Sequence, residues 1–327
     1  MQKIIIAGIG VLGLIGIGYF FYQSQSATPV AETKPLEKMT PPPQGQPMKK
    51  KEGLLPPLPP KPNTNATQGG PKETPATQTS TITQKVLDDS SSTLGSPVKV
   101  PTVDGKQYFI VGQPKGQNSK SPRKIIFALP GHGTTADTGY SAWKSHVVAD
   151  GTYALAVLNW WDGKGDETSH YYLPDATLAQ IKGFLDTYGY TSDDFVVLEG
   201  FSRGSANTYP VKAYDMVSGN PFIDAVISSS GKYQSNFPYT PKQSEYPKNQ
   251  KLYQDVPWIL VCGGKDPEPE RDGCPGMTET KTYLESSGAK ILALLEDPNE
   301  GHGAFHLSSL GLVKKALALL DALPQAQ

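Results

Sequence analysis

The feature that most constrains the fold is the alternation, after about residue 96, of short uninterrupted apolar runs with longer helix-like segments. A short apolar run that is buried on both sides is typical of a strand inside a parallel sheet. Helices between such strands provide the crossover connections and cover the two faces of the sheet. The pattern therefore predicts an α/β fold with a mostly parallel central sheet flanked by helices. The expected parallel strands are KIIFALP, YALAVLNW, DFVVLEGF, DAVISSS, PWILVCGG and KILALLED.

The region opens with a different pattern. The segments VKVPTV and QYFIVGQ flank the turn residues Asp104 and Gly105, which predicts an antiparallel hairpin ahead of the parallel strands. A single domain of this kind commonly has the length of residues 96–327. Helices are expected near 139–150 and over 175–189, 205–215 and 307–323.

Residues 1–22 differ in composition from everything that follows. Positions 4–22 are nineteen uncharged and almost wholly apolar residues. At about 1.5 Å of rise per residue, a helix of that length matches the hydrocarbon core of a bilayer. We therefore expect residues 1–22 to form a single transmembrane helix that anchors the protein. A cleaved signal peptide is the alternative, although no clean small-residue cleavage site follows the run.

Residues 23–95 are polar and rich in proline, serine, threonine and glutamine. They show neither the helical nor the strand period, and repeated proline removes backbone donors, so we expect a disordered linker. Lysines lie on both sides of the anchor, so charge alone does not orient it. The signal-like position and the long linker favour a domain outside the cytoplasm, secreted if the segment is cleaved.

Charge and cysteine content exclude several function classes. The 30 basic and 31 acidic residues give a net charge of −1, which offers no electrostatic basis for binding nucleic acid. The two cysteines, Cys262 and Cys274, are too few for a disulfide scaffold and lack the spacing of a metal finger. They are expected either to bridge, in an oxidising compartment, or to be thiols. No metal or cofactor is expected.

A candidate nucleophile follows the strand DFVVLEGF. Ser202 stands in Gly200-Phe201-Ser202-Arg203-Gly204, with a helix-like segment directly after it. A serine on a tight strand-to-helix turn needs small neighbours, because strand and helix then approach each other closely. The context predicts an exposed and reactive hydroxyl at the carboxyl end of the strand.

A base and an acid follow two later strands. His302, in NEGHG, comes after KILALLED, and histidine is suited to take a proton from serine because its ordinary pKa is near 6.5. His306 is the competing histidine, with packing or capping as its simpler role. Asp266, in CGGKD, is the expected partner that orients the imidazole. Asp272 and Asp297 remain alternatives.

Strand-GFSRG-helix, strand-GGKD and strand-NEGHG, in that order, resemble the α/β-hydrolase family over residues 96–323. The overall pattern is also similar to secreted esterases of the feruloyl-esterase and polyester-depolymerase kind. The resemblance implies an α/β-hydrolase fold with a Ser202-His302-Asp266 triad. It also implies an oxyanion hole made by two backbone N–H groups. One is that of Arg203, and the other comes from the loop GHGTT, where His132 is preferred to Thr134.

Aromatic residues at the expected strand ends suggest a substrate pocket. Trp160 and Trp161 follow the second parallel strand, and Tyr233 opens a tyrosine-rich loop. Each could bind substrate or simply close the edge of the core. We therefore expect a serine esterase that acts through an acyl-enzyme on a small-molecule or polymer-linked ester. A serine peptidase of the same fold is the enzymatic alternative, and a catalytically inactive surface binding module is the other.

Overall fold

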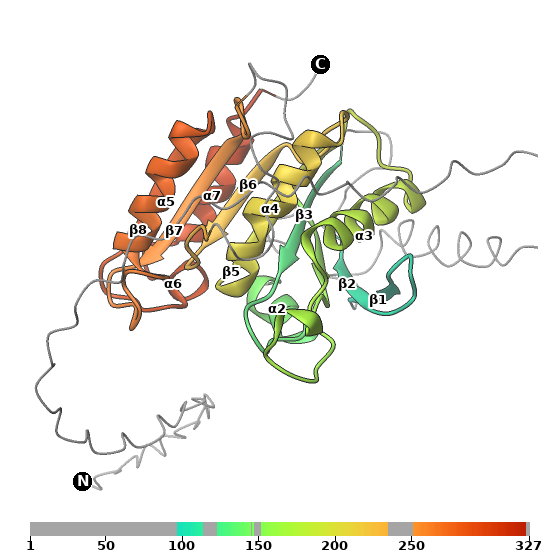
Figure 1. Ribbon diagram of the computed structural model, residues 1–327, viewed down its shortest axis with the longest axis horizontal. Helices are drawn as coiled ribbons and strands as arrows, with labels where there is room; N and C mark the ends of the chain where they lie inside the picture. The colour runs from blue at the N-terminus through green and yellow to red at the C-terminus, as the bar shows by residue number, and fades with distance from the viewer. Residues whose placement is uncertain (1–96, 114–122, 145, 147–151, 235–250, 325–327) are drawn as a thin grey trace, which may run out of the picture. The chain divides into compact units, whose positions relative to one another are not determined.

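The computed structural model describes residues 97–113, 123–144, 146, 152–234 and 251–324. Within them, eight strands form one sheet in the order β1-β2-β4-β3-β5-β6-β7-β8 (Figure 1). The strands are β1 (Val98–Pro101), β2 (Tyr108–Gly112), β3 (Lys124–Leu129), β4 (Ala154–Leu158), β5 (Phe195–Phe201), β6 (Ala225–Ser229), β7 (Pro257–Gly263) and β8 (Lys290–Asp297). The helices are α2 (Ala136–Trp143), α3 (Pro174–Thr187), α4 (Arg203–Val217), α5 (Cys274–Ser286), α6 (Ala304–Leu307) and α7 (Leu312–Asp321), with a 3-10 turn, η1, at Thr168–His170.

The sheet is mostly parallel, as the alternation of the sequence predicts. β4, β3, β5, β6, β7 and β8 pair in parallel, whereas β1 and β2 pair with their neighbours in antiparallel. The expected opening hairpin is present, with Val100 opposite Phe109. The α/β fold class predicted from the apolar runs is therefore confirmed for the described domain.

Two helical layers bury the sheet. Every residue of β4 is buried, and its sequence ALAVL offers an apolar side chain to each face. Residues of α3, α4 and α5 pack with one face, and residues of α2, α6 and α7 pack with the other. Figure 1 shows α3, α4 and α5 across the near face of the sheet, with α7 behind it.

Three helical segments differ from expectation. α5 was not predicted, because its sequence CPGMTETKTYLES is mostly polar and places few large apolar residues, such as Met277 and Leu284, against the core. The segment expected near 139–150 begins earlier, as α2. The closing helix begins later than expected, as α7 at Leu312, because Gly311 directly before it adopts a left-handed conformation with φ 64°. A separate short helix, α6, precedes it.

The anchor and the linker predicted over residues 1–22 and 23–95 lie outside the described residues. Of the helices that are described, none combines the length and the apolar composition needed to cross a membrane.

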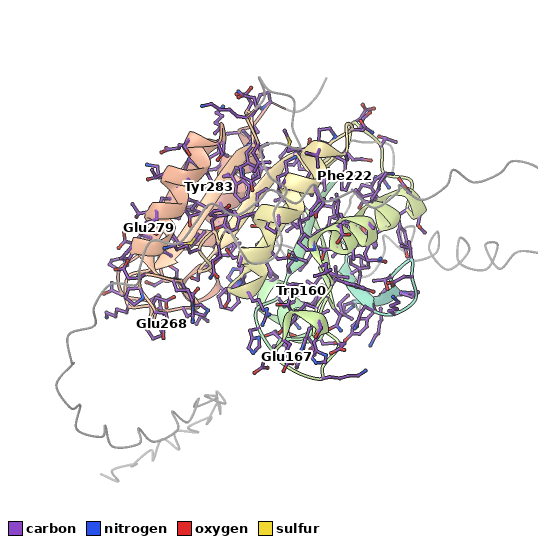
Figure 2. All side chains as sticks on the ribbon, viewed as in Figure 1. Trp160, Glu167, Phe222, Glu268, Glu279 and Tyr283 are labelled. Carbon is purple, nitrogen blue, oxygen red and sulfur yellow. A yellow bond between two sulfur atoms is a disulfide. The ribbon has the colours of Figure 1, made fainter. Side chains whose placement is uncertain are left out.

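The parallel strands bring their carboxyl ends to one edge of the sheet, where ligands bind in open α/β folds. The loops after β4 and β7 lie there, and Figure 2 shows Glu167 of the first loop and Glu268 of the second along the same side of the molecule. Ser202, Asp266 and His302 follow β5, β7 and β8 respectively, so the topology delivers all three residues to this edge.

Candidate active site

Ser202 occupies a strained turn between β5 and α4. Its φ of 54° and ψ of −117° lie in a region that L-residues rarely adopt. The turn requires its two glycines, because a Cβ at Gly200 would collide with the backbone of Gly204, and one at Gly204 would collide with the carbonyl of Leu129. The backbone N–H of Ser202 donates to the carbonyl of Ser229 at 2.8 Å, which ties the turn to β6.

The imidazole of His302 is held by Asp266. The Nδ1 atom lies 2.8 Å from Oδ2 of Asp266, whose carboxylate is buried while the imidazole is about one-third exposed. The other carboxylate oxygen accepts the N–H of Glu268 at 2.9 Å. A carboxylate on Nδ1 places the ring proton there and leaves Nε2 available to accept another proton.

The two alternative acids have other partners. Asp272 Oδ2 lies 4.0 Å from Nδ1 of His302, and the Arg271 guanidinium binds that oxygen at 2.6 Å. Asp297 accepts the Ser308 hydroxyl at 2.5 Å and the Asn299 N–H at 2.9 Å, and these hydrogen bonds lower its pKa. Asp266 is therefore the carboxylate in direct contact with the imidazole.

Contacts between loops bring the histidine next to the serine turn. The ring of Phe201, the residue before Ser202, lies 5.0 Å from the ring of His302. The N–H of Lys265 donates to the carbonyl of Glu300 at 2.9 Å, which fixes the histidine loop against the loop that carries Asp266.

The loop after β3 lies beside the serine. A Cβ at Gly131 would stand 3.2 Å from the Cβ of Ser202. Within this loop the N–H of Thr134 donates to the carbonyl of Gly131, and the N–H of Gly133 donates to the Tyr171 hydroxyl, both at 3.2 Å. The N–H groups of Thr134 and Gly133 are thus engaged within the protein, and the choice of His132 over Thr134 as an oxyanion donor stays a prediction.

Side chains that the sequence did not point to hold this loop. Tyr171 Oη lies 2.9 Å from Nδ1 of His132, and Arg203 Nη1 donates to the same nitrogen at 3.1 Å. The Arg203 guanidinium also lies over the Tyr171 ring, 4.1 Å from its centroid. His132 Nε2 faces the Asp166 carboxylate at 3.1 Å. Arg203, as the first residue of α4, also places its backbone N–H at a helix N-terminus, where negative charge is favoured.

The expected pocket aromatics have different environments. Trp160 is 2% exposed, and its indole N–H donates to the carbonyl of Pro130 at 2.9 Å. The prediction that Trp160 binds substrate is therefore wrong, since the indole lies beneath the loop and supports it. Trp161 is partly buried and donates to the carbonyl of Gly165 at 2.8 Å.

Tyr233 packs away from the serine turn. Its ring stacks on Tyr283 of α5 with centroids 3.7 Å apart and meets Tyr209 of α4 edge-on. Tyr233 therefore closes the surface between α4 and α5, and no contact of the described residues connects it with Ser202 or His302.

His306 and Glu199 are two further polar side chains near the site, and both contact Trp143. His306 packs edge-on against Trp143, and burial, together with His146, lowers the pKa of its imidazole to about 4. Glu199 of β5 is 1% exposed and accepts the indole N–H of Trp143 at 3.2 Å. Burial raises the pKa of Glu199 well above its usual value, although the Trp143 hydrogen bond opposes the shift. The His306 imidazole is therefore neutral at pH 7.

The pKa of His306 makes stability depend on pH. The unfolded imidazole titrates near 6.5 and the folded one near 4, so the contribution to stability is complete above pH 6.5 and is lost as the pH falls to 4. Between pH 7 and pH 4 we expect the unfolding free energy of wild type to fall by about 3 kcal/mol more than that of His306→Phe, because phenylalanine cannot titrate. Urea unfolding at several pH values measures the difference. The same dependence of unfolding free energy on pH in both proteins would contradict this expectation.

A disulfide joins Cys262 of β7 to Cys274 of α5, twelve residues apart in sequence. Of the two states expected from the sequence, the cysteines are therefore bridged rather than free. The crosslink closes a short loop that contains both Asp266 and Asp272.

Two groups of side chains have the ligand types of a metal site. Asp266, Asp272 and His302 place their donor atoms within 4.8 Å of one another, as do Cys262, Cys274 and Glu296. In the first group the 2.8 Å bond between Asp266 and His302, and the Arg271 guanidinium on Asp272, already use these donor atoms. In the second group the sulfurs are bonded to each other. In both groups the donor atoms that a cation would need are used by contacts within the protein.

No protein-family model matches the sequence, and no curated protein matches it either. Solved structures do resemble the described domain. A Thermus thermophilus protein, TT1662, superposes with a TM-score of 0.52 at 14% identity, over 72% of this chain and 100% of that one. An esterase/lipase from an uncultured bacterium gives 0.51 at 14% identity, over 78% and 94%. An esterase from Pyrobaculum calidifontis gives 0.51 at 12% identity, over 75% and 90%.

At such low identity the likeness concerns the fold. The parallel sheet, the two helical layers and the strained serine turn after β5 agree with it. The described domain has the α/β-hydrolase fold.

Proposed function

We propose that this protein is a serine hydrolase that cleaves a carboxylic ester through an acyl-enzyme. The observation that carries the proposal is the 2.8 Å pairing of His302 with Asp266 beside the strained turn that bears Ser202. A nucleophile, a base and an orienting acid at one sheet edge are the components needed to activate an alcohol.

In the proposed reaction the Ser202 hydroxyl attacks the ester carbonyl and His302 accepts its proton. The Asp266 carboxylate stabilises the imidazolium that forms. The backbone N–H groups of His132 and Arg203 bind the oxyanion of the tetrahedral intermediate, a contribution of about 3–4 kcal/mol for each donor in a typical site. His302 then donates its proton to the leaving alcohol. A water molecule activated by the same imidazole releases the acid and restores Ser202.

The comparisons support an ester rather than a peptide bond as the substrate. Two of the resembling structures are an esterase/lipase and an esterase. The same fold hosts many chemistries, so a serine peptidase remains the second candidate. The resemblance to feruloyl-esterase and polyester-depolymerase enzymes also stays a prediction. An inactive binding module is disfavoured because all three groups of the triad are present.

A fluorophosphonate probe tests the proposal. We expect stoichiometric labelling of the folded protein, with the adduct on the peptide that contains Ser202 as read by mass spectrometry. A parallel panel of p-nitrophenyl esters and peptide p-nitroanilides separates the esterase from the peptidase. Labelling at another residue, or none at all, would remove Ser202 as the nucleophile.

We further propose that the domain works outside the cytoplasm, held by residues 1–22 or released when they are cleaved. The Cys262–Cys274 disulfide supports an oxidising compartment. Protease added to intact cells is expected to degrade the domain of an anchored protein. Full protection of a membrane-bound form would contradict this placement.

A further inference from the structure

A cavity of about 260 Å³ adjoins three of the segments of the candidate active site, those that follow β3, β5 and β8. It lies on the α2 and α6 side of the sheet. It is lined by Pro130 of the loop after β3, by Phe201 directly before the serine and by Gly303 directly after the histidine. These three lining residues stand one or two positions from His132, Ser202 and His302, so a group bound in the cavity lies close to the candidate reacting groups.

Most residues of the lining are apolar, and its polar members are Thr134, Thr138, Glu199 and His306. Ala128, Val157 and Trp143 contribute to the apolar wall, and the buried Glu199 lies among them. Within the described part of the chain, Oε1 of Glu199 and Nδ1 of His306 are buried without a hydrogen-bond partner, and both side chains line the cavity. Burying a polar atom unpaired costs stability, so two of them around one cavity indicate that a bound polar atom completes the site.

The rim of the cavity is accessible. Thr138 of α2 is exposed, and Leu307 at the end of α6 is 70% exposed although it is a large apolar residue. A substrate group can thus enter between α2 and α6.

We propose that this cavity binds an apolar group of the ester substrate that ends in a hydroxyl, with the hydroxyl between Glu199 and His306. The inference rests on the proposed esterase function and names the substrate class for it. An apolar cavity of about 150 Å³ accommodates benzene, so 260 Å³ holds roughly six to ten non-hydrogen atoms. A hydroxyl can donate one hydrogen bond and accept another, so it can pair with Oε1 of Glu199 and with Nδ1 of His306, which accepts or donates according to its tautomer.

The first test narrows the rim. Leu307→Trp places a large ring at the entrance, and Leu310→Trp is the matched control, since Leu310 is 46% exposed and does not line the cavity. We expect wild type to prefer p-nitrophenyl hexanoate to the acetate in kcat/KM, and Leu307→Trp to lower that preference about tenfold while the control keeps it. Methyl hexanoate and hexyl acetate show which half of the ester occupies the cavity.

If Leu307→Trp and Leu310→Trp prefer the hexanoate to the acetate to the same extent, the proposal is overturned. If wild type hydrolyses acetate through Ser202 but shows no dependence on Leu307, the cavity assignment fails and the esterase assignment stands. If no ester is hydrolysed, the esterase assignment fails, and the binding measurement below still decides about the cavity.

The second test needs no turnover. In a Ser202→Ala background, phenol and benzene are titrated by NMR or calorimetry, with and without Glu199→Leu. We expect Glu199→Leu to weaken phenol binding about tenfold and to leave benzene binding within about threefold. Glu199→Gln, which retains hydrogen-bonding groups, is expected to keep the phenol affinity and guards against a folding defect. Equal phenol affinity with glutamate and leucine at position 199 would overturn the role of Glu199.

Discussion

Replacing Ser202 with alanine is expected to lower kcat for an ester substrate by about 10⁶-fold. Alanine has no hydroxyl to form the acyl-enzyme, so only substrate binding and the oxyanion donors remain to accelerate the reaction. The fold should persist, because an alanine Cβ meets the same surroundings as the serine Cβ at a φ of 54°. Initial rates with p-nitrophenyl butyrate measure the loss, and thermal unfolding checks the fold.

The matched control is Ser286→Ala, since Ser286 is an exposed serine near the end of α5 and donates to the carbonyl of Tyr283. Its kcat should equal that of wild type. A Ser202→Ala protein with more than about one-hundredth of the wild-type rate would show that another group performs the attack.

Asp266→Asn is expected to lower kcat about 10⁴-fold, and Asp272→Asn less than tenfold. The amide of asparagine donates toward Nδ1 of His302, which favours the tautomer that cannot take the serine proton. Asp272 lies 4.0 Å from the imidazole and is bound by Arg271, so its loss leaves the 2.8 Å contact of Asp266 in place.

Asp266 positions another group, and the test must therefore separate positioning from structure. KM should change little in Asp266→Asn while kcat falls, and the NMR signal of the His302 Nδ1 proton should lose its strong downfield shift. The opposite ranking of the two variants would assign the acid to Asp272.

The sheet could be predicted because each central strand is marked by its own apolar run in the sequence. Runs such as ALAVL and FVVLEGF are buried in the structure along almost their whole length, so an uninterrupted apolar run is a direct record of a central strand. α5 could not be predicted in this way. It is a surface helix that contributes only a few apolar side chains to the core, and the disulfide at Cys274 and its packing on β7 and β8 supply the rest.

The three loops of the site could be predicted from strand ends, but the contacts within them could not. Asp266 and Asp272 stand six positions apart on the same loop. Only the tertiary placement of Arg271 and of the histidine loop makes one of them the nearer acid. Trp160 follows a strand end as a pocket residue would, yet its indole turns inward to reach the carbonyl of Pro130.

Glu199 did carry a signal that pointed to a site. It is the one charged residue inside the apolar strand FVVLEGF, and an ionisable group in a fully buried strand is uncommon without a partner or a function. Tyr171 carried no comparable signal, because SHYYLP contains two adjacent tyrosines and nothing in the sequence distinguishes the one that binds His132.

The Cys262–Cys274 bond makes the segment that carries the acid a covalent ring closed on the core of the sheet. Such a ring lowers the conformational entropy of the unfolded chain, which stabilises the folded state by about 3 kcal/mol. It also holds the carboxylate in place when the helix beside it frays. Reduction of the disulfide would free the loop that carries Asp266 well before the sheet itself unfolds. Turnover should thus respond to thiol reductants at concentrations that leave the circular dichroism spectrum unchanged.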